Sequence, residues 1–323
     1  MVGPTLDEIV AAKAEVQADL IETPVLPLKS ARWDGLLPAG AEVAVKLELF
    51  QQAGSFKTRG ALLGIRHLDA DQRAAGVVAA SGGNHALGVS WAAKAAGVDA
   101  LIAMPKATDP ARIAGCEALG ATVTLHDDMA AAFAAMNEAA AAGRALMHPF
   151  EADIMILGSA TCGYEYATQT PQIDTYVIPI GGGGMISGMA CAIKQMNPAA
   201  TVIGVEPYGA DSMSQSFAAG EAVRIEKVAT IADSLGAPLA MPLTFGVART
   251  YVDRIVKIED REMLTAMDVY QQNLRITAEP ACAASLAAIL GPLKDDLAGR
   301  QVGIIACGSN ISLERYGALM AAL

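Results

Sequence analysis

The sequence predicts an α/β fold, a mostly parallel sheet covered by helices on both faces. Short apolar runs alternate with helical stretches along most of the 323 residues. Glycine-rich turns follow several of these runs, as expected where a strand passes into a helix. Gly97 and Gly120 stand directly after helical stretches, where left-handed caps end helices.

The apolar runs predict strands at residues 43–49, 77–80, 100–104, 122–125, 176–180, 202–205 and 302–306. Their length and their content of valine, isoleucine, leucine and alanine are typical of buried parallel strands. Residues 86–96 follow one glycine turn and residues 185–196 follow another, so both segments are predicted helices. Ligands bind at the carboxyl ends of strands in open α/β sheets, which directs attention to these turns.

Length and composition narrow the function classes. A chain of 323 residues suggests two domains. The net charge of −11 and the lack of a basic run argue against a nucleic-acid partner. Five cysteines without a Cys-x-x-Cys pair argue against a disulfide framework or a zinc ribbon. No secretory signal and no membrane-spanning stretch are visible, so we expect a cytoplasmic protein without a membrane partner.

Lys57 lies in the run Gly-Ser-Phe-Lys-Thr-Arg-Gly-Ala at residues 54–61. A lysine that is desolvated in a pocket loses proton affinity and can form a Schiff base with a carbonyl cofactor. Taken alone, the run favours an exposed lysine at a helix start, because most lysines are exposed. Three further loops reverse that interpretation.

The first of these loops is Ser-Gly-Gly-Asn-His at residues 81–85, between a strand-like run and a helix. Backbone N–H groups at such a helix start attract anions. The second is the run of four glycines at residues 181–184, which lets the backbone approach a phosphate. The third is Cys-Gly-Ser-Asn at residues 307–310, directly after the last predicted strand.

In this order and spacing, the four loops resemble those of the fold-type II pyridoxal-phosphate enzymes, the tryptophan synthase β-like fold. Within that group they resemble the serine/threonine dehydratase and serine racemase branch. The resemblance runs from Thr23 to Asn310. It implies two open, twisted, mostly parallel sheets with helices on both faces. Residues 1–52 and 149–323 would form a large cofactor-binding domain, and residues 53–148 a small domain that closes over the active site.

The resemblance also implies roles for individual residues. Lys57 would be the catalytic residue that holds pyridoxal 5'-phosphate and then removes the substrate α-proton. The cofactor-binding set would be Phe56, Lys57, Asn84, Gly181, Gly182, Gly183, Gly184, Glu279 and Cys307, and the substrate carboxylate would be bound by Ser81, Gly83 and His85. Without the resemblance, Phe56 is a core residue, Asn84 a helix N-cap and His85 a packing residue, while Glu279 is a helix-cap carboxylate.

Two matched positions bear on the choice of reaction. Cys307 matches the residue that faces the pyridine nitrogen, and a neutral thiol is a weak partner there. The ring is then a poorer electron sink, which favours prompt expulsion of a β-leaving group. Gly82 matches a serine that serine racemase uses as acid and base on the face opposite the lysine. Because glycine carries no proton, racemisation is disfavoured.

The resemblance implies that two ligands of the relatives' metal site correspond to the Glu206 carboxylate and the Ala210 carbonyl. Binding of Mg²⁺ or Ca²⁺ is therefore one possibility. The third ligand position falls on Ser212, although Asp211 is adjacent. Another departure from the family is Ser-Ala at residues 159–160 in place of Gln-Gly. It leaves the shape of the pocket there undetermined.

A rival interpretation starts from Gly182-x-Gly184-x-x-x-Gly188 and the acidic Glu206 that ends the next strand. This pattern is a variant dinucleotide loop, which would suit a nicotinamide-dependent dehydrogenase. The spacing departs from the strict Gly-x-Gly-x-x-Gly.

The expected activity is dehydration and deamination of L-threonine or L-serine to a 2-oxo acid and ammonia. Three alternatives stay open: another β-hydroxy amino acid such as 3-hydroxyaspartate as substrate, a serine racemase-like activity, and a catalytically idle binding protein. The expected partners are the amino-acid substrate and a second copy of the chain in a homodimer.

Overall fold

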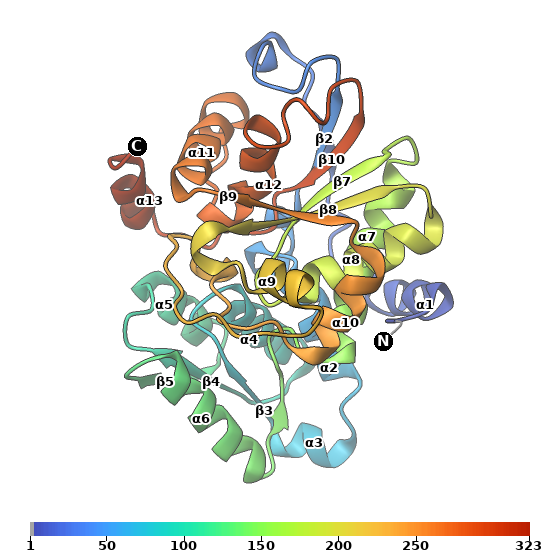
Figure 1. The fold of residues 1–323 in the computed structure, drawn as a ribbon. Coiled ribbons are helices and arrows are strands. Elements are labelled where there is room, and N and C mark those ends of the chain that lie inside the picture. The colour runs from blue at the N-terminus through green and yellow to red at the C-terminus, as the bar shows by residue number, and fades with distance from the viewer. Residues whose placement is uncertain (1–2) are drawn as a thin grey trace.

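The computed structural model describes residues 3–323 and contains two sheets. The strand order is β1-β2-β10-β7-β8-β9 in the larger sheet and β5-β4-β3-β6 in the smaller one. Within residues 3–323, β1 and β2 form the single antiparallel pair of strands, and all other pairs are parallel. Figure 1 shows β3, β4 and β5 with α6 in the lower part of the molecule and the larger sheet above them. The predicted class, α/β with two mostly parallel sheets, is confirmed.

The large sheet consists of β1 (Val25–Pro27), β2 (Glu42–Lys46), β7 (Thr175–Pro179), β8 (Thr201–Pro207), β9 (Arg254–Ile258) and β10 (Gln301–Ile305). The small sheet consists of β3 (Val77–Ala80), β4 (Ala100–Pro105), β5 (Thr122–His126) and β6 (Ala145–Leu146). Strands β1, β6 and β9 were not predicted. Two of them are only two or three residues long, and β9 is an edge strand whose apolar run is broken by Arg254 and Lys257. The other strands lie within a few residues of their predicted positions.

The helices are α1 (Leu6–Val16), α2 (Lys57–Arg66), α3 (Ala70–Ala75), α4 (Asn84–Ala96), α5 (Pro110–Ala118), α6 (Met129–Ala141), α7 (Asp153–Gln169), α8 (Gly184–Met196), α9 (Ser212–Ala219), α10 (Pro242–Tyr251), α11 (Asp260–Leu274), α12 (Pro280–Leu290) and α13 (Leu313–Met320). Short 3-10 turns are η1 (Ala31–Trp33), η2 (Glu48–Phe50), η3 (Gln52–Gly54), η4 (Tyr208–Ala210) and η5 (Asp233–Leu235). Gly97 ends α4 in the left-handed conformation, as predicted. No helix in the described part of the chain is long and apolar enough to cross a membrane.

Helix α2, which begins at Lys57, crosses α7 at a point where both helices carry glycine. A side chain at Gly158 of α7 would collide with the backbone of Gly60 of α2. The two helices therefore approach more closely than any other residue would allow. This crossing fixes the first turn of α2, and with it Lys57, against the helix that follows residues 148–152.

A network of buried charged side chains also contacts α2, through Arg59. Arg59 contacts Glu48 at 2.7 Å and Glu165 at 2.8 Å, and Lys46 contacts Glu165 at 2.5 Å. The side chains of these four residues are at most 2% exposed. Lys13 of α1 reaches the second Glu165 oxygen at 2.7 Å. Paired in this way, the buried charges tie α1, α2 and α7 to strand β2.

Candidate active site

The four predicted loops meet between the two sheets. Residues Ser55 and Gly308 form an antiparallel bridge, and the Phe56 N–H donates to the Cys307 carbonyl at 3.2 Å. The lysine loop is thus joined directly to the loop that follows β10. Both the asparagine loop after β3 and the glycine loop after β7 lie at the carboxyl ends of their strands, which is the ligand-binding edge of an open sheet.

Asn84 is the centre of a hydrogen-bond chain that connects these loops. Its amide nitrogen donates to Glu279 at 2.5 Å, and its amide oxygen accepts from Asn310 at 2.7 Å. The Asn310 side chain also donates to the Ala53 carbonyl in the lysine loop at 2.8 Å. Burial raises the pKa of Glu279 to about 7, against the opposing effect of Arg112. The structure therefore brings Asn84 and Glu279 together and adds Asn310, to which the sequence assigned no role.

Lys57 is the first residue of α2, and its Nζ donates to the Pro149 carbonyl at 2.6 Å. The buried Phe56 ring lies 5.2 Å from that nitrogen. Burial lowers the Lys57 pKa from 10.5 to about 8, with a smaller opposing effect of Cys307. A substantial fraction of the amine is therefore neutral near physiological pH, the form that attacks a carbonyl.

This lowered pKa predicts how binding of pyridoxal phosphate by the cofactor-free protein depends on pH. Because the neutral amine must react with the aldehyde, the association rate should rise about tenfold per pH unit below pH 8 and level off above it. Stopped-flow absorbance between pH 6 and pH 10 measures this profile. A midpoint near 10.5, the value for an exposed lysine, would contradict the partly buried, desolvated position of the Lys57 amine.

Phe56, Lys57, Pro149, Ser159 and Gly184 line one small cavity, so the lysine loop and the glycine loop face the same space. Gly183 is the N-cap residue of α8, in the left-handed conformation with φ +89°, and as a glycine it has no side chain to cap this helix. A side chain at Gly182 would collide with the Phe150 ring. An amine beside an uncapped, glycine-lined helix start fits a flat aldehyde cofactor that carries a phosphate.

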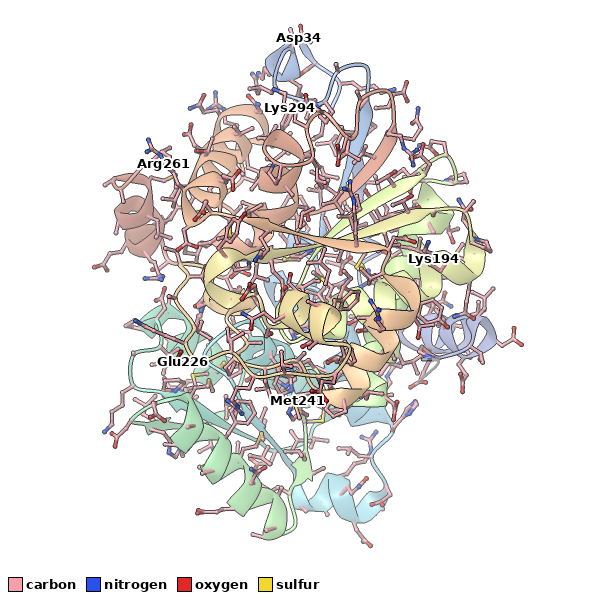
Figure 2. The ribbon with its side chains drawn as sticks, in the orientation of Figure 1. Asp34, Lys194, Glu226, Met241, Arg261 and Lys294 are labelled. Atoms are coloured by element: carbon pink, nitrogen blue, oxygen red, sulfur yellow. The ribbon has the colours of Figure 1, made fainter. Side chains whose placement is uncertain are left out.

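A larger cavity, of about 490 Å³, lies beside η1 and contains none of the predicted site residues. Asp34 and Lys294 are among its lining residues, and Figure 2 shows both at the top of the molecule.

Cys307 is buried, and its Sγ lies 3.6 Å from the Ala281 carbonyl. Burial raises the pKa of its thiol well above the usual value, with Cys282 and Glu279 adding to the effect. The thiol is therefore neutral at physiological pH. It has the weak hydrogen-bonding character expected of a partner that leaves a pyridine nitrogen unprotonated.

The residues predicted to bind the substrate carboxylate cluster at the start of α4. The Ser81 hydroxyl accepts from the Gly83 N–H at 3.1 Å. His85 Nε2 lies 2.8 Å from the Met147 carbonyl, and burial together with Lys57 lowers the His85 pKa to about 3. The ring is neutral, so Nε2 carries the proton and donates. The N-cap residue of α4 is Gly83, which has no side chain to cap the helix, so the N–H groups of its first turn are available to an anion.

Arg112 contacts several of the predicted site residues, and the sequence did not single it out. Its side chain extends from α5. It donates to the Gly82 carbonyl at 3.2 Å and to the Asn310 carbonyl at 2.7 Å. It also forms ion pairs with Asp233 and, at 3.3 Å, with Glu279. A single arginine in the first turn of α5, the helix that follows β4, is the signal that could have found it.

The groups near Glu206 do not fit a divalent cation as they are placed. The two Glu206 oxygens accept the N–H groups of Met213 at 2.9 Å and Ser214 at 2.7 Å. The Asp211 carboxylate pairs with Lys257 at 3.1 Å. In the described part of the chain no cluster of three His, Cys, Asp or Glu residues could hold a metal ion. Glu206, with its pKa raised to about 7 by burial, acts as the cap of α9.

The same contacts bear on the dinucleotide interpretation. A ribose-binding carboxylate needs free oxygens at the end of its strand, whereas both Glu206 oxygens are used by α9. The glycine loop instead shares its cavity with Lys57. Fold and site together fit an open α/β enzyme in which a lysine would hold a phosphate-bearing aldehyde.

Comparison with known proteins agrees with this class. A family model described as pyridoxal-phosphate dependent enzyme matches residues 16–308. Phenylserine dehydratase of Ralstonia pickettii is 41% identical, covering 95% of this chain and 93% of that protein. L-threonine ammonia-lyase of Thermotoga maritima is 39% identical, covering 85% and 68%. The structure of maize serine racemase matches with a TM-score of 0.92 and 34% identity, covering 100% and 98%.

The chain belongs to the family of pyridoxal-phosphate dependent enzymes. Its cofactor is pyridoxal phosphate, and its reaction class is that of the pyridoxal-phosphate-dependent ammonia-lyases. This rules out the nicotinamide-dependent dehydrogenase as an interpretation of the glycine loop.

Proposed function

We propose that the protein dehydrates and deaminates a β-hydroxy amino acid with an uncharged side chain, of the L-threonine or L-serine type, to a 2-oxo acid and ammonia. The observation that carries this proposal is Lys57, whose amine has a lowered pKa and faces the same cavity as the glycine loop. One relative is named for phenylserine and another for L-threonine. Both of these amino acids carry a β-hydroxyl and an uncharged side chain.

The cofactor, when bound, supplies the electron sink that makes the substrate α-proton removable. Lys57 Nζ would take that proton, and the neutral Cys307 thiol would leave the electron sink weak. The β-hydroxyl would then leave as water, with the proton that Lys57 took returned to it. The free N–H groups at the start of α4 hold the substrate carboxylate. Those of the glycine loop and α8 hold the cofactor phosphate. Water then releases ammonia from the dehydrated product.

Two features favour an uncharged substrate over 3-hydroxyaspartate. Arg112, a cation beside the substrate loop, already donates to two backbone carbonyls and to the carboxylates of Asp233 and Glu279. A second substrate carboxylate would find this arginine occupied and would meet these two acidic side chains. The rings of His148 and Phe150 pack edge to face at 4.9 Å on either side of Pro149, whose carbonyl accepts from Lys57. Apart from Lys57, the residues that line the cavity of this lysine are uncharged, which suits an uncharged substrate side chain.

A panel of β-hydroxy amino acids tests the proposal. We expect L-threonine, L-serine or phenylserine to release ammonia and 2-oxo acid with a kcat/KM at least about tenfold above that for 3-hydroxyaspartate, since like charges in the pocket oppose the latter. Chiral chromatography should find little D-amino acid, because Gly82 has no side chain to donate a proton. Equal turnover of 3-hydroxyaspartate would contradict the proposed specificity, and D-serine formed as fast as pyruvate would move the chain to the racemases.

We further propose that residues 53–148 act as a small domain that closes over the site on the large domain of residues 1–52 and 149–323. Arg112 supports this arrangement, because it reaches from α5 to Asp233, Glu279 and Asn310. A cytoplasmic homodimer is proposed as the working form. Sedimentation equilibrium at micromolar concentration tests the dimer, and small-angle scattering with and without substrate tests the closure.

A further inference from the structure

Gly82 and Thr108 share one space beside the substrate loop. Gly82 follows β3, and Thr108 follows the neighbouring parallel strand β4. A Cβ atom built on Gly82 would lie 2.6 Å from the Thr108 hydroxyl oxygen and 3.5 Å from Pro105 Cδ. The Thr108 hydroxyl thus stands where the side chain of residue 82 would otherwise be.

That hydroxyl is buried, and among residues 3–323 it has no hydrogen-bond partner. Thr108 is fixed from its backbone, since its N–H donates to the Pro105 carbonyl at 3.0 Å. Burying a hydroxyl without a partner costs free energy, so such groups in native proteins commonly await a ligand or a water molecule. The position at the ligand-binding edge of the small sheet favours a ligand.

We infer that the Thr108 hydroxyl, which follows β4, donates its proton to the carboxylate of the substrate and so acts as a binding group beside Gly82, not as a proton donor to the α-carbon. This inference rests on the proposed function. The carboxylate is the substrate group concerned because it is the anion that the uncapped start of α4 attracts, and Gly82 lies two residues before that helix. Nearby Arg112 is committed to Asp233 and Glu279, which leaves the hydroxyl as an additional donor.

Replacing Thr108 by valine, which has the same shape without the hydroxyl, tests the inference. Binding of L-alanine, an amino acid without a β-hydroxyl, is measured by calorimetry on the cofactor-loaded enzyme. We expect Thr108→Val to weaken L-alanine binding by roughly 10- to 100-fold, the range for a hydrogen bond to a charged group. The KM for the best substrate should rise similarly, while kcat changes less. Thr108→Ser, which keeps the hydroxyl, should restore most of the affinity.

Thermal unfolding without substrate separates this role from a structural one. Because valine removes an unpaired buried hydroxyl, Thr108→Val should melt at the same temperature as the wild type or higher. A variant that binds L-alanine as well as the wild type does would overturn the inference. A wild type that releases no ammonia from any amino acid of the panel would instead refute the proposed function, so the two failures are distinguishable.

Moving the hydroxyl to residue 82 gives an independent check. Gly82→Ser alone should be poorly tolerated, because its Cβ would lie 2.6 Å from the Thr108 oxygen. Thr108→Ala opens that space and should lose L-alanine affinity. Adding Gly82→Ser to Thr108→Ala should regain part of the affinity, because the serine hydroxyl then occupies the vacated position. If the double variant binds no better than Thr108→Ala, the shared space does not serve the substrate.

Discussion

Replacing Lys57 with alanine should lower the rate of ammonia release by about 10³-fold or more, because the change removes both the attachment point of the cofactor and the base that takes the α-proton. Affinity for pyridoxal phosphate should fall as well. In the proposed function the lysine amine is the nucleophile for the aldehyde; it lines the cavity, and burial lowers its pKa to about 8. Steady-state assays and a titration of the cofactor-free variant measure the two effects.

Borohydride reduction followed by peptide mass spectrometry identifies the attachment site directly. In the wild type the reduced cofactor should be found on the peptide that contains Lys57. Lys227→Ala is a matched control, because Lys227 is an exposed lysine outside the site and its loss should leave the rate unchanged. A cofactor fixed to another lysine, or a Lys57→Ala variant with an undiminished rate, would refute the assignment.

The largest effect on stability is expected at Glu165. Changing Glu165 to glutamine removes the carboxylate that Lys13, Lys46 and Arg59 share. Arg59 keeps its contact with Glu48. Breaking one partner of a buried ion pair costs about 3–5 kcal/mol, since an uncompensated charge stays in a medium that solvates it poorly. Urea unfolding of the cofactor-free protein measures the loss. Glu226, which is exposed and labelled in Figure 2, offers the control variant Glu226→Gln, with an expected change near zero.

Acid should remove the same stabilisation in the wild type. Burial acts to raise the Glu165 pKa, but Arg59 and Lys46 outweigh it and lower the pKa from 4.5 to about 2. As the pH falls, Glu165 therefore becomes protonated in the unfolded chain before it does so in the folded protein. The contribution of Glu165 is fully present above pH 4.5 and is lost as the pH falls towards 2, a change of about 3 kcal/mol. The free-energy difference between the wild type and Glu165→Gln should shrink over this interval, and an unchanged difference would contradict the ion network.

Much of this protein could be predicted along the chain, because the signals are local. Seven strands were found from their apolar runs, since a strand buried on both faces in a parallel sheet needs consecutive apolar residues. Strand β9 was missed because it lies at the sheet edge, where Arg254 and Lys257 are tolerated. The placement of Lys57, Asn84 and the glycine loop in one site was inferred from a family resemblance, because periodicity says nothing about which loops meet.

Other features arise only from contacts between distant segments. Arg112 reaches Asp233, Glu279 and Asn310, which are more than 100 residues away in the chain. Glu206 looked like a metal or ribose ligand, yet the start of α9 turns back onto it and uses both oxygens. Thr108 carried no sequence signal at all, because its importance depends on the empty side-chain position at Gly82.

The sequence by itself determined the α/β class, most of the strands and the chemical character of the four loops, because burial, helix capping and glycine geometry act over a few residues. The folded structure decided which of those loops share a cavity, how far burial shifts the pKa of Lys57, and which polar groups remain unpaired. These properties depend on desolvation and hydrogen bonding by groups that only the packing of the two sheets brings within a few ångströms of one another.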